Sequence, residues 1–302
     1  MADVTDCVFR QIIAKYGKPD VFWTEFVSAD GLAHPDAREK LLIDLKFEKN
    51  EHPIVAQIFG SNVDNIREAS KLCAELGFDG VDINMGCPDK SIEKQGAGAS
   101  AIKNPAHARE IIKAAKAGAP HLPISVKTRI GYNKNEIETW IPEILKEGVA
   151  VLTVHLRTRK EMSLVPAHWE LMSQIIALRD KIAPETLIIG NGDVLNVEDG
   201  KKKIFETGCD GVMLGRAIFG NPWLFDENKK QISIREKLEV MCEHTKLFEE
   251  KLGAHKNFAI MKKHYKAYCN GFDGAKELRM KLMEAENAEE VGKITNDFLM
   301  KI

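Results

Sequence analysis

The chain has 302 residues, of which 44% are apolar and 29% charged, and its formal net charge is −2. This composition is typical of a folded globular protein, and the length allows one large domain with a smaller one. A polycation is excluded, so a nucleic-acid surface would have to be a local patch. Because the sequence has no apolar run of roughly 18 residues and no signal-like start, we expect a cytoplasmic protein.

Strand-like and helix-like segments alternate up to about residue 230. The strand-like runs are apolar, rich in β-branched residues and bounded by Gly, Pro or polar clusters, which is typical of a parallel sheet covered on both faces. The segments between them have helical periodicity and recognisable ends, such as Asn62 before one helix and Gly77 after it. The expected strands are Val21–Val27, Ile54–Gly60, Gly80–Gly86, Ile124–Ile130, Val151–Arg157, Thr186–Gly192 and Gly211–Ala217.

This alternation indicates βαβ units and therefore an α/β fold. Seven strands are one fewer than a closed eight-stranded barrel has, and the missing one should precede Thr5, where only Met1 to Val4 lie. We therefore predict a TIM (β/α)8 barrel with a truncated first strand over residues 1–230. A doubly wound open sheet is the alternative.

The strand signal ends after Gln231, and only segments with helical periodicity follow. Breaks at Gly253 and at Asn270-Gly271 separate them. We predict that residues 231–302 form a small all-α helical bundle. Its expected helices are Ile234–Leu252, Lys256–Cys269, Gly274–Ala285 and Glu289–Ile302.

Polar residues occur at nearly every expected strand end. In a barrel of this type the ligand site lies at the carboxyl ends of the strands, so these side chains should converge on it. Such convergence favours a polar ligand. The residues are Glu25, Gln57, Asn84, Cys87, Lys127, Arg129, His155, Arg157, Asn191, Asp193, Gly215 and Arg216.

The last two strand ends indicate a phosphate site. Asn191-Gly192-Asp193 and Gly215-Arg216 offer glycine backbone and one cation, at the strands where such barrels bind phosphate. Either motif alone could be only a tight turn. Lys127 and His155 could place a cation beside a reduced flavin ring, and Gln57 could donate to and accept from the ring edge. For each of these three residues a structural role is the alternative.

The six cysteines are scattered and contain no Cys-x-x-Cys pair, which argues against a disulfide framework and a zinc site. Cys87 follows a strand and lies between Gly86 and Pro88, on a constrained loop that should face the site. A thiol there can act as an acid or as a nucleophile. The other five cysteines are expected to be small buried hydrophobes.

Two further motifs need interpretation. Gly96–Ala101 matches the dinucleotide fingerprint G-x-G-x-x-A, but it does not directly follow a strand, so we interpret it as a close-packed loop. The helical segment His255–Lys266 is the best nucleic-acid candidate, because lysines and aromatic residues alternate in it without an acid. A solvated basic face is the alternative. Its lysines are Lys256, Lys262, Lys263 and Lys266.

These motifs, in this order, resemble the tRNA dihydrouridine synthase family of bacterial type, and the resemblance covers nearly the whole chain. The most specific match is Asp82-Ile83-Asn84-Met85-Gly86-Cys87-Pro88 followed by Gly96-Ala97-Gly98-Ala99. The other matching segments are Val4–Asp6 with Phe9-Arg10, Thr24-Glu25 with Ser28-Ala29, Val126–Arg129, Val154–Arg159, Gly190–Asp193, Gly215–Ala217 and Asn221–Trp223.

The resemblance implies a TIM barrel that binds FMN, reduced by NADPH or NADH, and a helical domain that helps to hold tRNA. By match, Gln57, Lys127 and His155 contact the flavin ring, Asn191–Asp193 and Gly215-Arg216 hold its phosphate, and Met1 stands at a flavin-contacting methionine. Hydride would pass from flavin N5 to C6 of a flipped-out uracil, and Cys87 would protonate C5. Asn84 and Arg129 would contact the base or the tRNA. We expect a monomer without a metal ion.

The sequence departs from the family pattern at two places. Asp3 stands at the family's glycine and the leading strand and proline are absent, while Leu156 and the run Met162–Pro166 replace a usual glycine and a Tyr-Ser-Gly-Pro-like run. Two other functions therefore remain open. One is a flavin reductase of a free pyrimidine or small enone, which would not need the basic helix. The other is an RNA-binding protein that has lost its flavin.

Overall fold

The computed structural model describes residues 4–302 of the chain. Its internal contacts divide the chain into two compact units. The sheet unit consists of Val21–Leu45 and His52–Gly215, and the helical unit consists of the chain up to Asp20, Lys46–Glu51 and Arg216–Ile302.

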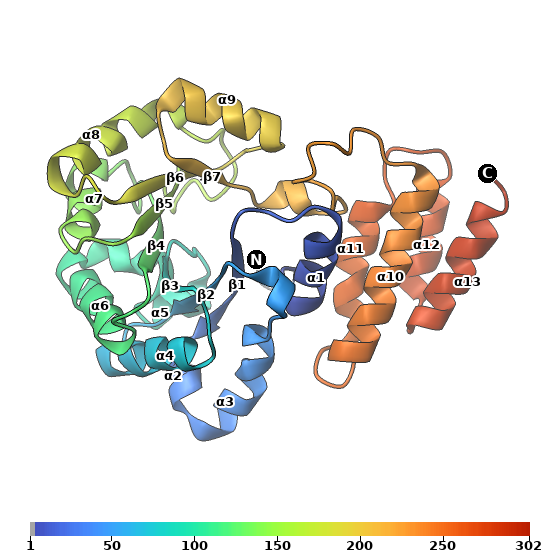
Figure 1. Cartoon of the computed structure of the whole chain (residues 1–302), viewed down its shortest axis with the longest axis horizontal. Coiled ribbons are helices and arrows are strands. Elements are labelled where there is room, and N and C mark those ends of the chain that lie inside the picture. Colours follow the sequence, from blue (N-terminus) through green and yellow to red (C-terminus); the bar gives the residue numbers. More distant parts are fainter. Residues whose placement is uncertain (1–3) are drawn as a thin grey trace. The chain divides into compact units, whose positions relative to one another are not determined.

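The sheet unit contains seven parallel strands that pair strictly in chain order. A doubly wound sheet changes direction within its strand order, so the sequential order excludes that alternative. Figure 1 shows the sheet curled, with its helices along the outside. The strands are β1 (Phe22–Ser28), β2 (Ile54–Phe59), β3 (Gly80–Met85), β4 (Ile124–Arg129), β5 (Val151–His155), β6 (Leu187–Asn191) and β7 (Gly211–Met213).

All seven strands lie within a residue or a few of their predicted positions, because each is a short apolar run bounded by Gly, Pro or polar residues. The eighth strand was expected before Thr5, and Met1 to Asp3 lie outside the described residues. Among residues 4–302 no pairing joins β7 to β1, so the described sheet is curled but open.

The helices of the sheet unit connect successive strands and cover them. Local signals fix their ends: the Asn62 side chain accepts from the N–H groups of Asp64 and Asn65, and the helix at Val197 ends at Gly208 in the left-handed region (φ 75°). The helices are α2 (Ala29–Ala33), α3 (Pro35–Leu41), α4 (Val63–Glu75), α5 (Lys90–Lys94), α6 (Pro105–Gly118), α7 (Ile137–Leu145), α8 (Met172–Ile182) and α9 (Val197–Thr207), with 3₁₀ turns at Leu42–Leu45, Gly98–Lys103 and Trp169–Leu171.

The helical unit contains α1 (Cys7–Tyr16), α10 (Ile234–Leu252), α11 (Met261–Tyr268), α12 (Ala275–Glu284) and α13 (Ala288–Leu299), and 3₁₀ turns at Lys49–Glu51, Arg216–Ile218 and Phe258–Ile260. Helix α1 packs on α10, where the Phe9 ring stacks on His244 with centroids 4.9 Å apart. None of the helices in the described part of the chain is long and apolar enough to cross a membrane.

This division differs from the predicted boundary after residue 230. The helical unit already begins at Arg216, and it includes α1, which the sequence placed with the barrel. The reason is the burial of the apolar face of α1, including Phe9, Ile12 and Ile13, within the helical unit. The buried side chain of Arg10 adds a 2.6 Å ion pair with Glu51.

Candidate active site

The strand register brings predicted site residues side by side at the carboxyl ends of β2 to β6. Gln57 is opposite Asp82, and Asn84 is opposite Lys127. Arg129 is opposite His155, which in turn is opposite Asn191. In a parallel sheet, residues paired in register lie side by side and point to the same face, so the members of each pair are neighbours.

A buried chain of hydrogen bonds links β2 and β3 to the Cys87 loop (residues 84–88). Oδ2 of Asp82 accepts from Nε2 of Gln57 at 2.7 Å, and Oε1 of Gln57 accepts from Nδ2 of Asn84 at 3.1 Å. Oδ1 of Asn84 then accepts from the backbone N–H groups of Gly86 (3.1 Å) and Cys87 (2.9 Å). The two amides that the sequence assigned to ligands therefore also hold the loop.

The carbonyl groups of the Cys87 loop are bonded as well. Nε of Arg129 donates to Gly86 O at 2.8 Å, and the N–H of Ala99 donates to Cys87 O at 2.9 Å. Gly98 has φ +60°, and a Cβ added there would lie 2.6 Å from Cys87 O. The Gly96–Ala99 segment is thus packed closely against the Cys87 loop. The close packing agrees with the prediction, but a 3₁₀ turn begins at Gly98 where a loop was expected.

The Cys87 thiol is half-buried and packs against Phe59, Ile92 and Ala97. Burial raises the pKa of this thiol, while Arg129 and Lys127 partly oppose the shift. The raised pKa keeps the thiol protonated at neutral pH. Cys87 is therefore suited to give a proton rather than to attack as a thiolate.

Lys127 supplies a cation beside this thiol. Its half-buried position, together with the charge of Arg129, lowers its pKa to about 8, and Asp82 opposes the shift. No hydrogen bond to its ammonium group comes from any residue between 4 and 302. The ammonium group can therefore bind a carbonyl or an anionic atom of a ligand.

Arg129 is buried and makes most of its bonds to backbone. Besides Gly86 O, its Nη1 donates to the carbonyls of Thr158 (3.1 Å) and Met162 (3.0 Å). Burial lowers its pKa to about 10, so it stays charged at neutral pH. The side chain thus ties the loop after β5 to the Cys87 loop.

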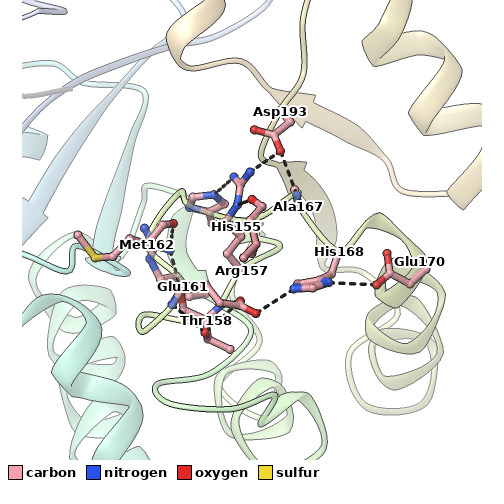
Figure 2. Close-up of polar contacts among 11 residues, drawn as sticks. His155, Arg157, Thr158, Glu161, Met162, Ala167, His168, Glu170 and Asp193 are labelled. Carbon is pink, nitrogen blue, oxygen red and sulfur yellow. Dashed lines mark hydrogen bonds and ion pairs between the residues drawn. The ribbon is translucent and has the colours of Figure 1, made fainter.

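Arg157 lies between His155 and Asp193, as Figure 2 shows. Its Nη1 donates to Nε2 of His155 at 3.1 Å, and its Nη2 forms an ion pair with Asp193. Since Nε2 of His155 accepts, the ring proton resides on Nδ1. Asp193 also accepts from the N–H of Ala167 at 3.0 Å. The sequence placed Arg157 at a strand end near the expected ligand site, but it did not identify these partners, because they come together only in the folded chain.

The predicted phosphate residues have definite local roles. Nδ2 of Asn191 donates to Met213 O at 2.8 Å, which joins β6 to β7. Gly192 has φ +121°, and a Cβ there would lie 2.8 Å from Ala167 Cβ, so only glycine fits. At Gly215 an added Cβ would meet nothing within 4 Å, so the backbone is open to close approach. Arg216, the next residue, belongs to the helical unit.

The predicted lysines lie in the helical unit. Helix α11 buries Met261, His264, Tyr265 and Tyr268, a spacing that leaves Lys262, Lys263 and Lys266 off the buried face. Lys256 precedes this helix, which is shorter than the predicted Lys256–Cys269 because a 3₁₀ turn occupies Phe258–Ile260. Met1 lies outside the described residues. In residues 4–302 no cluster of His, Cys, Asp or Glu is placed to bind a metal ion.

Residues 1–302 match the family described as dihydrouridine synthase (Dus). A probable tRNA-dihydrouridine synthase 2 of Bacillus subtilis (strain 168) is 44% identical over 303 residues, which cover 100% of this chain and 93% of that protein. A probable tRNA-dihydrouridine synthase of Staphylococcus aureus (strain N315) is 41% identical over 300 residues, which cover 99% of this chain and 91% of that protein.

Solved structures of similar fold include an old yellow enzyme homologue from Zymomonas mobilis, with a TM-score of 0.53 and 13% identity over 75% of this chain and 84% of that one. Morphinone reductase in complex with tetrahydroNAD has a TM-score of 0.52 and 13% identity, covering 74% of this chain and 82% of that one. At such low identity these similarities concern the fold.

Proposed function

Since the chain belongs to the dihydrouridine synthase family over its whole length, we propose that it reduces uridines of tRNA to 5,6-dihydrouridine, with FMN as cofactor and NADPH or NADH as reductant. The observation that carries this proposal is the half-buried thiol of Cys87 on a loop fixed at both its N–H and carbonyl groups. A proton donor that must meet one face of a base needs such a fixed position.

The residues of the sheet unit fit a flavin. The unbonded ammonium of Lys127 would bind the N1 and O2 region of the ring, and Gln57 and His155 would contact its edge. Asn191, Gly192, Asp193, Gly215 and Arg216 would hold the phosphate, chiefly through backbone N–H groups, because the Asp193 carboxylate is already paired with Arg157. When bound by these residues, FMN would supply the hydride for C6 of the uracil. The curled parallel sheet supports a TIM-barrel fold.

The side chains of the protein donate the proton, orient the base and bind the tRNA. Cys87 donates its proton to C5 of the uracil, on a base that has left the stack. Asn84 and Arg129 position the Cys87 loop and provide the polar wall against which the base is oriented. Lys256, Lys262, Lys263 and Lys266 of the helical unit bind the tRNA backbone, where cations contribute most of the affinity.

Comparing substrates tests this function. The purified protein with FMN and NADPH should reduce unmodified tRNA much faster than free uridine, because the tRNA supplies binding energy outside the reacting base. A flavin absorbance spectrum, recorded during titration with FMN, should show bound flavin. Faster reduction of free uridine would favour a small-molecule reductase, and a protein that binds tRNA but no FMN would favour a non-catalytic RNA-binding role.

A further inference from the structure

The buried series of hydrogen bonds that leads to the Cys87 loop ends, on each side, in a group that can act only as an acceptor or only as a donor. At one end the carboxylate of Asp82 can only accept, and at the other the backbone N–H groups of Gly86 and Cys87 can only donate. The two amides between them, Gln57 and Asn84, could each point either way if they stood alone.

Only one orientation of the Gln57 and Asn84 amides gives every group in this series a hydrogen-bond partner. If Gln57 turned over, its oxygen would face the Asp82 carboxylate, and if Asn84 turned over, its NH₂ would face the N–H groups of the loop. Each reversal would leave polar groups unsatisfied in a buried site, where that costs most. Asp82 is thus the acceptor that the whole chain requires.

Stability alone does not explain a carboxylate at this position. Asp82 is fully buried, and burial raises its pKa to about 6, although hydrogen bonds from Ser125 and Gln57 and the charge of Lys127 oppose the shift. An apolar residue of similar volume would avoid this desolvation. The second oxygen of Asp82 accepts from the Ser125 hydroxyl at 2.5 Å, so both oxygens are used.

We propose that Asp82 is a positioning residue, whose carboxylate sets the direction of hydrogen bonding through Gln57 and Asn84 and thereby holds the Cys87 thiol in place. The inference deepens the proposed function, and it rests on that function only where tRNA reduction is measured. The hydrogen-bond direction itself can be tested without tRNA or flavin.

Four variants separate direction from charge: Asp82→Ala, Asp82→Asn, Ser125→Ala and the double variant Asp82→Asn/Ser125→Ala. In Asp82→Asn the amide oxygen can still accept from Gln57, because the Ser125 hydroxyl can reverse and accept from the new NH₂. In the double variant the new NH₂ has no acceptor and is left as a buried unsatisfied donor, so the amide is no longer held with its oxygen towards Gln57. Thr153→Val is a matched control, since the buried Thr153 hydroxyl on β5 has no hydrogen-bond partner among the described residues.

The first readout is hydrogen exchange of the Gly86 and Cys87 amides in the folded full chain, and the second is alkylation of Cys87 by iodoacetamide. Asp82→Ala and the double variant should accelerate both about tenfold, as expected when one buried hydrogen bond is lost. Asp82→Asn and Ser125→Ala alone, like Thr153→Val, should change them less than about threefold. In tRNA reduction the two disrupted variants should lose kcat with KM for tRNA unchanged.

The proposal would be overturned if Asp82→Asn accelerated amide exchange and alkylation as much as Asp82→Ala, and if adding Ser125→Ala to Asp82→Asn had no further effect. That result would mean that the charge of Asp82 matters rather than the direction of hydrogen bonding. Unchanged exchange and alkylation in Asp82→Ala would overturn it too. If the wild-type protein failed to reduce tRNA while the exchange pattern held, the proposed function would be wrong and the role of Asp82 in holding the loop would stand.

Discussion

Lys127 and Cys87 have opposite pKa shifts at neighbouring strand ends. Burial lowers the pKa of the Lys127 ammonium to about 8 and raises that of the Cys87 thiol. At neutral pH the site therefore holds one cation and one protonated thiol. This pair matches a reduction in which negative charge develops on a ring while a proton is delivered to carbon.

The low pKa of Lys127 predicts how flavin affinity depends on pH. If the flavin ring binds the ammonium, it binds the protonated form of Lys127 more tightly, so affinity should be constant up to about pH 7 and fall above the pKa of about 8. Quenching of FMN fluorescence measures this. Lys127→Arg should remove the fall, because arginine stays charged. Affinity that is constant to pH 9.5 in the wild type would contradict this role of Lys127.

At the scale of single residues, the sequence predicts candidate site residues from their positions in the strands. Gln57, Lys127 and His155 were predicted from their positions in apolar runs, and the structure places them on β2, β4 and β5. Their contact with a ligand stays a prediction. The partners of Arg157 and the acceptor role of Asp82 were missed. Both depend on hydrogen bonds between strands or loops far apart in sequence, which residue spacing does not reveal.

Among the elements of the sheet unit, the turn at Gly98 packs directly against the Cys87 loop. Gly98→Ala should cost about 3 kcal/mol, from the left-handed backbone together with the clash with Cys87 O. Because the clash moves the loop, Cys87 alkylation should also change. Urea unfolding and alkylation rates measure the two effects.

Gly77→Ala is the matched control for this turn. Gly77 also has positive φ (+86°), but an added Cβ there would meet nothing within 4 Å. It should cost about 1 kcal/mol and leave Cys87 alkylation unchanged. If both variants lost the same stability and neither affected alkylation, the close packing of Gly98 would not determine the position of the Cys87 loop.

The core of the helical unit has its own pH dependence. His264 is buried, neither ring nitrogen has a hydrogen-bond partner within residues 4–302, and its pKa is lowered to about 3. The unfolded chain binds this proton more tightly, so stability should be full above pH 6.5 and fall as the pH drops towards 3. The free energy of unfolding of α10 and α11 can be measured at pH 7.5 and at pH 5 by urea titration, with hydrogen exchange of their amides as the signal.

His264→Leu should flatten this dependence, because no buried imidazole then has to stay neutral. His244, which stacks on Phe9 and has its pKa lowered by burial, should account for what remains. A variant with undiminished loss of stability at pH 5 would show that other groups set the acid sensitivity.

For the whole molecule, the sequence found the strands but not the division of the chain. The strand runs and α10 are local patterns, and α10 has its predicted bounds. Helix α1 joins the helical unit because Phe9 meets His244, more than two hundred positions later. Such a contact leaves no local signal, so the predicted boundary after residue 230 differs from the observed one.

For the whole protein, we expect the lysines of α11 to contribute most of the affinity for tRNA. Replacing Lys262, Lys263 and Lys266 with alanine should weaken tRNA binding and reduce the slope of log affinity against log salt by about 2 to 3. Filter binding over a salt series measures the slope. A matched triple variant of the exposed lysines Lys71, Lys113 and Lys202 in the sheet unit should leave it unchanged. Equal effects of the two triple variants would mean that tRNA senses only the net charge.

The most direct test of the account is the amount of dihydrouridine formed in unmodified tRNA in a single turnover with prereduced FMN-loaded protein, measured by nucleoside mass spectrometry. Wild type and Cys242→Ala, whose thiol is also half-buried with a raised pKa, should form dihydrouridine at the same rate. Cys87→Ala should be at least about a hundredfold slower, the usual effect of a general acid. Equal rates for Cys87→Ala and wild type would contradict the proton-donor role, and no dihydrouridine from the wild type would contradict the proposed function.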